Sequence, residues 1–150
     1  SASVARAEDA MFLIESGSSE GGGKSAVAEF MPGNVGTGRP VALIFFGNGS
    51  ANLSSGDKGI LRDVAQLYLQ RGGGKLRVVG HASSSVGGSD PVKQRLANFK
   101  ISVDRSSAVA RSLTDSGVPA GIVEVDAVSD NAPLLEGGEA ADRRVEIYLN

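Results

Sequence analysis

The chain has 150 residues, 41% of them hydrophobic and 21% charged, with one histidine and no cysteine. This length and composition indicate a globular protein with one domain and a tail. The missing cysteines exclude thiol catalysis, cysteine-based zinc sites and disulfides, and a single histidine excludes multi-histidine metal sites. A net charge of −2 gives no electrostatic reason to expect nucleic acid, and no apolar run is long enough to span a bilayer.

Residues 1–39 are predicted to form an N-terminal arm or linker that contains one short element at most. A brief apolar run at residues 10–14 is followed by a Gly/Ser-rich stretch. Residues 18–25 also approach the pattern of a phosphate-binding loop that ends in Lys24. That pattern requires glycine where Ser18 stands, and Pro32 would break the helix that must follow. We therefore favour a flexible linker over a nucleotide site.

Orderly periodicity begins at Pro40. Residues 41–46 form a continuous apolar run, which is typical of a strand buried on both faces. Ser54, Ser55 and Asp57 offer capping chemistry for a helix that ends at the glycines of residues 72–74. A second strand is expected at residues 76–79.

Asp90 and Pro91 mark the start of the longest helix, with an aspartate cap and proline at the first helical position; it continues to Gly117. Further strands are expected at residues 122–125 and, half-buried, at residues 145–149. The predicted core stripe of the long helix consists of Val92, Leu96, Phe99, Val103, Ala110 and Leu113. The order β-α-β-α-β-β predicts an α/β fold of the α+β sandwich type, with a mixed four-stranded sheet and two main helices on one face.

Four dispersed segments, in the right order, resemble the OmpA-like domain family. Residues 44–53 are similar to the family's opening segment, and residues 79–81 to its Gly-His-Thr-Asp strand end. Residues 98–105 match its Asn-x-x-Leu-Ser-x-x-Arg helix motif, and residues 142–147 match its closing Asn-Arg-Arg-Val-Glu-Ile strand. We therefore identify residues 40–150 as an OmpA-like domain.

The resemblance implies non-covalent binding of the diaminopimelate side chain in the stem peptides of peptidoglycan. It implies no catalysis, so we expect no enzyme, no catalytic residue, no metal and no cofactor. The expected role is to anchor an envelope protein to the cell wall in the periplasm of a Gram-negative bacterium, attached to the outer membrane or cell envelope. The expected partner is peptidoglycan, with no nucleic acid and no membrane span in this chain.

Asn98, Ser102 and Arg105 lie along one helical stripe, which we expect to be distinct from the core stripe. Arg105 is the candidate carboxylate clamp, because a guanidinium can grip a carboxylate through two hydrogen bonds. Asn98 is a candidate ligand residue beside it. We also count Asn48, in the opening segment, among the candidate ligand-binding residues.

The chain departs from the family where the ligand's ammonium group needs a partner. Ser83 stands where the family has the Asp of its Gly-His-Thr-Asp motif, and the loop that follows is longer. Counting back from Asn98 by the family's spacing reaches Asp90, which is the candidate replacement. A helix cap is the plainer role for Asp90, and we favour it.

Strand alternation places Arg143 on the side of the buried residues and Arg144 on the opposite side. Both are candidate ligand residues, and structural and ligand roles are both open, with the pair divided between them as one option. Asp126, Asp130 and Glu139 are candidate internal partners for these arginines.

Two other interpretations remain. His81 near Ser83 could suggest a catalytic pair, but no nucleophile elbow is present, so we favour a structural or ligand-adjacent histidine. The alternative function is a degenerate OmpA-like scaffold for protein–protein or homodimer contacts, with weak or no peptidoglycan binding. The missing aspartate and the long Ser/Gly loop motivate it.

Overall fold

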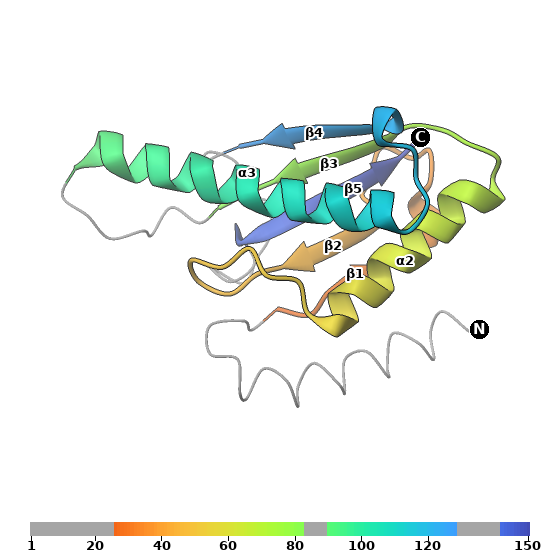
Figure 1. Cartoon of the computed structure of the whole chain (residues 1–150), viewed down its shortest axis with the longest axis horizontal. Helices are drawn as coiled ribbons and strands as arrows, with labels where there is room; N and C mark the ends of the chain where they lie inside the picture. The colour runs from red at the N-terminus through yellow and green to blue at the C-terminus, as the bar shows by residue number, and fades with distance from the viewer. Residues whose placement is uncertain (1–25, 83–89, 129–141) are drawn as a thin grey trace.

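The computed structural model describes residues 26–82, 90–128 and 142–150. It contains a five-stranded sheet in the order β1-β2-β5-β3-β4, with two long helices on one face (Figure 1). The strands are β1 (Glu29–Phe30), β2 (Ala42–Phe45), β3 (Leu76–Gly80), β4 (Val123–Ala127) and β5 (Arg144–Leu149), and the helices are α2 (Ser55–Gln70) and α3 (Pro91–Asp115). Short 3-10 turns lie at Pro32–Asn34 and Ala120–Ile122.

The sheet is mixed, as expected. Strand β5 lies at the centre, antiparallel to both β2 and β3, whereas β3 and β4 run parallel. Strand β1 adds a fifth strand through two residue pairs with β2. Two residues are too few to show an alternating pattern, so periodicity could not reveal this strand.

Strand β1 also bears on the expected division of the chain at Pro40. Ala28 is buried in the main core, and Gly36 donates a backbone hydrogen bond to Leu149 O at the end of β5. The folded unit therefore includes part of the segment expected to be an arm. Residues 1–25, with the linker and the phosphate-loop pattern, lie outside the described residues.

Helix α2 begins as its capping chemistry predicts. Asp57 N donates to Ser54 Oγ at 3.0 Å, and Ser54 N donates to Asp57 Oδ2 at 2.9 Å, which completes a capping box. Helix α3 begins at Pro91, and the Asp90 carboxylate accepts hydrogen bonds from Val92 N and Lys93 N. The start predicted at Asp90 and Pro91 is therefore confirmed to the residue, and the capping chemistry predicted for Ser54 to Asp57 is also confirmed.

The main core lies between the sheet and the two helices. Ile60, Leu61 and Val64 of α2 pack there with Val109 and Leu113 of α3. The sheet contributes apolar side chains from the same face of β2, β3 and β5, namely Ile44, Val78, Val145 and Ile147. Helix α2 contacts β1 and β2, and α3 contacts β3, β4 and β5 (Figure 1).

The predicted core stripe of α3 is wrong over the first half of the helix. Val92, Leu96 and Phe99 are 58%, 64% and 50% exposed, and of the six residues in that stripe only Leu113 is buried. The buried side instead runs through Asn98, Ser102, Arg105, Ser106, Val109 and Leu113. The first turns of α3 extend past the ends of the strands, so no sheet lies there to cover an apolar stripe (Figure 1).

Gly80 explains how a polar stripe of α3 comes to face the sheet. A Cβ atom at Gly80 would lie 2.3 Å from Ser102 O and 3.0 Å from Ser106 Cβ. The last residue of β3 therefore touches the helix backbone, an approach that only glycine permits. Small hydroxyl residues fill the rest of this contact. The close approach brings Arg105, one turn further along, to the ends of β2 and β3.

Candidate functional site

Arg105 is the centre of the candidate site. Its side chain is 1% exposed, and its guanidinium donates to three backbone carbonyls. Nε bonds Ser50 O at 2.8 Å, Nη2 bonds Gly47 O at 3.1 Å, and Nη1 bonds His81 O at 3.2 Å. One side chain from α3 thus joins the loop after β2 to the end of β3.

The charge of Arg105 meets no carboxylate within the described part of the chain. Its guanidinium carbon lies 5.4 Å from the centre of the Phe46 ring, a cation–π contact. Burial, and then the nearby positive charge of Arg143, lower the pKa of Arg105 to about 10. The group remains a cation at neutral pH. A guanidinium has five N–H groups, so these three hydrogen bonds leave one N–H group on each terminal nitrogen.

Arg143 lies on the same side of the sheet as Arg105, as strand alternation predicted. Its side chain is buried, and Nε donates to Phe46 O at 3.1 Å. The backbone of the two segments is also joined, because Phe46 N donates to Arg143 O at 2.8 Å. Two guanidinium groups, one from α3 and one from the residue just before β5, therefore converge on the end of β2. Such a pair of cations favours an anionic partner.

Asn98 lies on the stripe of Arg105, seven residues earlier. Its side chain is completely buried, yet within residues 26–82, 90–128 and 142–150 neither its amide nitrogen nor its amide oxygen has a hydrogen-bond partner. A buried polar group without a partner destabilises a fold by about 1–3 kcal/mol. The neighbouring Ser102 hydroxyl differs, because it donates to Phe99 O within its own helix. Among the described residues, Asn98 is thus a side chain of this stripe whose hydrogen-bonding capacity is unsatisfied.

Arg144 belongs to a different cluster on the opposite face of the sheet. It is fully buried, and its Nε donates to Glu146 Oε2 at 2.8 Å; Asp142 Oδ1 lies 3.7 Å from its Nη1. Glu146 Oε1 accepts from Tyr148 OH at 2.8 Å and lies 3.2 Å from His81 Nε2. Alternation along β5 therefore separates the two arginines, and Arg144 contacts protein carboxylates.

Electrostatics in this cluster favour ionised Glu146. Burial acts to raise the pKa of its carboxyl, but contacts with His81, Tyr148 and Arg144 outweigh burial and lower the pKa to about 2. The Tyr148 hydroxyl shows the reverse effect, since burial and its hydrogen bond to Glu146 raise its pKa to about 12. His81 thus has a structural side chain, while its carbonyl serves Arg105. Ser83, the serine near His81 in sequence, lies outside the described residues.

The other candidate residues are placed as follows. Asp90 caps α3 and is exposed, which confirms the favoured interpretation of its carboxylate as a helix cap. Asn48 is exposed in the loop after β2, next to the Gly47 carbonyl that holds Arg105. Asp126 pairs with Arg77 at 2.8 Å rather than with Arg143 or Arg144. Ser83, Asp130 and Glu139 lie outside the described residues.

A model of the OmpA family matches residues 45–146, about two thirds of the chain. The chain belongs to the OmpA family. The matched region contains Arg105, Arg143 and Arg144 and the C-terminal ends of β2 and β3. No curated protein matches the sequence, so the family assignment rests on this match and on the fold.

Several solved structures share the OmpA-like fold. The OmpA-like domain of FopA1 from Francisella tularensis is 21% identical, with a TM-score of 0.64 over 73% of each chain. The peptidoglycan-associated lipoprotein from Burkholderia pseudomallei is 19% identical, with a TM-score of 0.62 over 76% of this chain and 92% of the other. The cell wall anchor of the T6SS from Pseudomonas aeruginosa is 26% identical, with a TM-score of 0.57 over 71% and 77%.

The groups that meet at the ends of β2 and β3 are hydrogen-bond donors and acceptors. In residues 26–82, 90–128 and 142–150, no cluster of three or more metal-ligating side chains occurs. No helix in those same ranges is both long and apolar enough to cross a membrane. Backbone carbonyls and guanidinium groups line the end of β2, and these recognise charged and polar groups through hydrogen bonds. Sequence reasoning missed the Gly47, Ser50 and His81 carbonyls, because side-chain patterns carry no information on them.

Replacing Glu146 by glutamine should destabilise the domain in a pH-dependent way. The folded pKa of about 2 lies below the ordinary value of 4.5, so ionised Glu146 stabilises the fold above about pH 5, and this contribution is lost as the pH falls toward 2. We expect Glu146→Gln to lower the free energy of unfolding by about 3 kcal/mol at pH 7 and by much less at pH 2.5. Urea unfolding at both pH values measures this.

The matched control is Glu124→Gln. Glu124 pairs with Lys75 at 3.5 Å, but both side chains are more than half exposed. Exposed pairs contribute about 0–1 kcal/mol, so this variant should unfold almost like the wild type. Equal losses in the two variants at pH 7 would contradict the assigned role of the buried cluster.

Proposed function

We propose that the domain binds peptidoglycan non-covalently and anchors an envelope protein to the cell wall. The observation that carries the proposal is the buried Arg105 guanidinium, which meets Arg143 at the end of β2 and has no carboxylate partner in the described chain. A carboxylate of a peptidoglycan stem peptide would supply the missing negative charge. The names of two structural neighbours, a peptidoglycan-associated lipoprotein and a cell wall anchor, support the same ligand.

Each candidate residue has a role in this proposal. Arg105 binds the carboxylate of diaminopimelate through the two N–H groups that the backbone carbonyls leave over, and Arg143 adds a second positive charge. The Asn98 amide, which has no hydrogen-bond partner among the described residues, donates to or accepts from the ligand's polar atoms. Asn48 borders the loop that holds Arg105. Arg144 acts structurally, because its contacts are with protein carboxylates.

The ammonium group of diaminopimelate requires a negative or carbonyl partner as well. Asp90 is our candidate, because its cap uses Oδ1 for both backbone hydrogen bonds. Ser83, at the position of the family aspartate, would supply a hydroxyl in place of a charge. A hydroxyl contact is weaker than a charge-assisted one, so the role of Asp90 decides how tightly the domain binds.

We place the protein in the periplasm, attached to the outer membrane or another part of the cell envelope. This location follows from the proposed ligand, since a cell wall anchor must reach peptidoglycan. The proposal involves no catalysis and no cofactor. Its chemistry is the exchange of hydrogen bonds and charge contacts between the protein and a wall fragment.

A second candidate function is contact with another copy of the chain. Val92, Leu96 and Phe99 form an exposed apolar stripe on the first three turns of α3, and the start of this helix extends beyond the strands (Figure 1). A contiguous exposed apolar stripe is typical of a protein interface. Pairing of two such stripes would bury them in a symmetric dimer. Dimerisation through this stripe does not depend on peptidoglycan binding.

The first test is Arg105→Lys. Lysine keeps the positive charge but loses the bidentate geometry, so we expect binding to purified sacculi to weaken by about ten- to a hundredfold, equivalent to ~1.5–3 kcal/mol. Co-sedimentation with sacculi measures this, and circular dichroism checks that the variant folds. Arg95→Lys, on an exposed turn of the same helix, is the matched control and should bind like the wild type. Full binding by a folded Arg105→Lys variant would reject the clamp.

The variant Asp90→Asn tests whether Asp90 contacts the ligand in addition to capping α3. Asparagine caps helices about as well as aspartate, so thermal stability should stay close to that of the wild type. Loss of the negative charge should nevertheless weaken binding of free diaminopimelate by about tenfold, if Asp90 contacts the ammonium group. Isothermal titration calorimetry measures the affinity. Unchanged affinity in a stably folded Asp90→Asn variant would leave Asp90 as a cap alone.

The dimer is tested by the double variant Leu96→Asp/Phe99→Asp. Both side chains are at least half exposed, so the variant should fold normally. We expect the wild type to show a concentration-dependent dimer in sedimentation-velocity ultracentrifugation and the variant to remain monomeric. Leu69→Asp changes an equally exposed residue on α2 and serves as control. A monomeric wild type at millimolar concentration would rule out this interface.

A further inference from the structure

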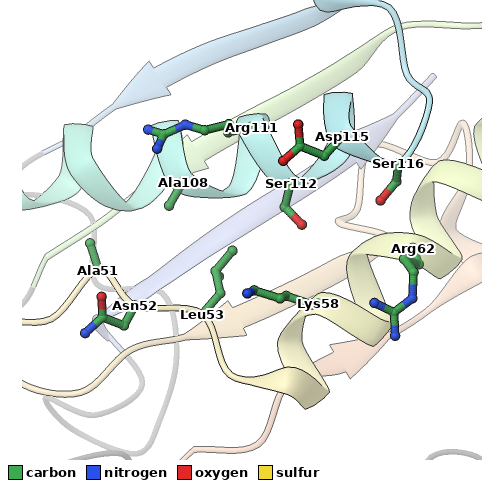
Figure 2. Close-up of a pocket in the computed structure, with 10 residues that line it drawn as sticks. All are labelled: Ala51, Asn52, Leu53, Lys58, Arg62, Ala108, Arg111, Ser112, Asp115 and Ser116. Atoms are coloured by element: carbon green, nitrogen blue, oxygen red, sulfur yellow. The ribbon is translucent and has the colours of Figure 1, made fainter.

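A polar groove lies between α2 and α3, on the helical face of the molecule. It has a volume of about 710 Å³, and its walls come from the loop after β2 and from both helices (Figure 2). Lys58 and Arg62 line it from α2, and Arg111, Ser112 and Asp115 line it from α3. In Figure 2 the Lys58 side chain extends from α2 toward Leu53, and Ser112 points from α3 toward α2.

The groove is positively charged although the chain is not. Three cations and one carboxylate give its lining a formal charge of +2, against −2 for the whole chain. None of the three cations, Lys58, Arg62 and Arg111, forms an ion pair within the described residues. Positive potential concentrated in a hollow attracts anions.

Helix stability does not explain this arrangement. Lys58 and Arg62 stand four residues apart on α2, and like charges at that spacing repel each other. Lys58 also lies in the first turn of the helix, where the helix dipole favours negative charge. Both placements oppose folding, so a role in binding accounts for them better than a role in the fold.

The groove continues the line of the candidate peptidoglycan site. Arg105 and Ser112 are seven residues apart on α3, which places them on one face and about 10 Å apart along the helix axis. The loop after β2 serves both places, because its Gly47 and Ser50 carbonyls hold Arg105, and Asn52 lines the groove. One extended ligand can therefore contact both.

We propose that this groove binds further carboxylates of the same peptidoglycan fragment whose diaminopimelate group Arg105 holds. The inference rests on the proposed function. Stem peptides carry several carboxylates, and three cations beside two hydroxyl residues match that chemistry. The groove thus extends recognition from a single amino-acid end group to the stem peptide around it.

The test uses the full chain with Lys58→Gln/Arg62→Gln and, separately, Arg111→Gln. Glutamine keeps helix propensity and removes charge. We expect the double variant to bind sacculi about tenfold more weakly in co-sedimentation and with a smaller dependence on salt, because fewer charge contacts form. Binding of free diaminopimelate, measured by calorimetry, should not change, since this small molecule occupies the Arg105 end alone.

The matched control is Lys93→Gln/Arg95→Gln, which removes the same charge from exposed positions at the other end of α3. Wild-type affinity for sacculi in the Lys58→Gln/Arg62→Gln variant overturns the groove proposal and leaves the Arg105 site standing. An equal loss in the control overturns it too, since total charge would then explain the effect. A wild type that binds neither sacculi nor diaminopimelate rejects both proposals. Displacement of sacculi from the groove by inorganic phosphate at equal ionic strength would assign it to phosphate instead.

Discussion

The buried guanidinium of Arg105 holds three separate segments of the domain together. A buried cation loses its contacts with water, which costs free energy unless other polar groups replace them. Around Arg105, three backbone carbonyls and the Phe46 ring provide the replacement contacts. Each carbonyl comes from a segment that leaves the sheet, so the arginine fixes where those loops lie relative to α3. Carbonyls neutralise no charge, however. The positive charge persists at the sheet end and defines what kind of ligand this end can bind.

The close packing of Gly80 on α3 made the core side of that helix hard to predict. Helix bounds followed from local chemistry, because caps such as Asp90 act within a single turn. The buried face of α3 could not be predicted in this way, because it depends on which other element packs against the helix. Gly80 allows the close approach of the helix backbone, so Ser102 and Ser106 are buried, while Leu96 in the second turn of α3 stays exposed. Hydrophobic periodicity assumes a covering layer along the whole helix, and the first turns of α3 have none.

Strand alternation predicted side-chain positions better than helix periodicity did. It requires only that successive side chains of a strand point to opposite faces of the sheet. From Val145 it placed Arg143 on the helix side and Arg144 on the opposite side, and both positions agree with the structure. The family motif likewise indicated Arg105 as a key residue. Neither pattern could show that backbone carbonyls would surround Arg105, since any residue at positions 47 and 50 offers a carbonyl. The groove between the helices was missed for a similar reason, as Lys58 and Arg111 are far apart in sequence.

The polar features that oppose folding lie along one line of α3. Asn98, Arg105 and Ser112 follow each other at seven-residue spacing, so they share a face and span about 21 Å of the helix. Among the described residues, Asn98 is buried with no hydrogen-bond partner and Arg105 is buried with no carboxylate beside it. The groove beside Ser112 is lined by three cations. Apolar residues along this line would stabilise the domain more. A polar line kept at a cost in stability is what an extended ligand with several charged groups requires, and a stem peptide of peptidoglycan has that form.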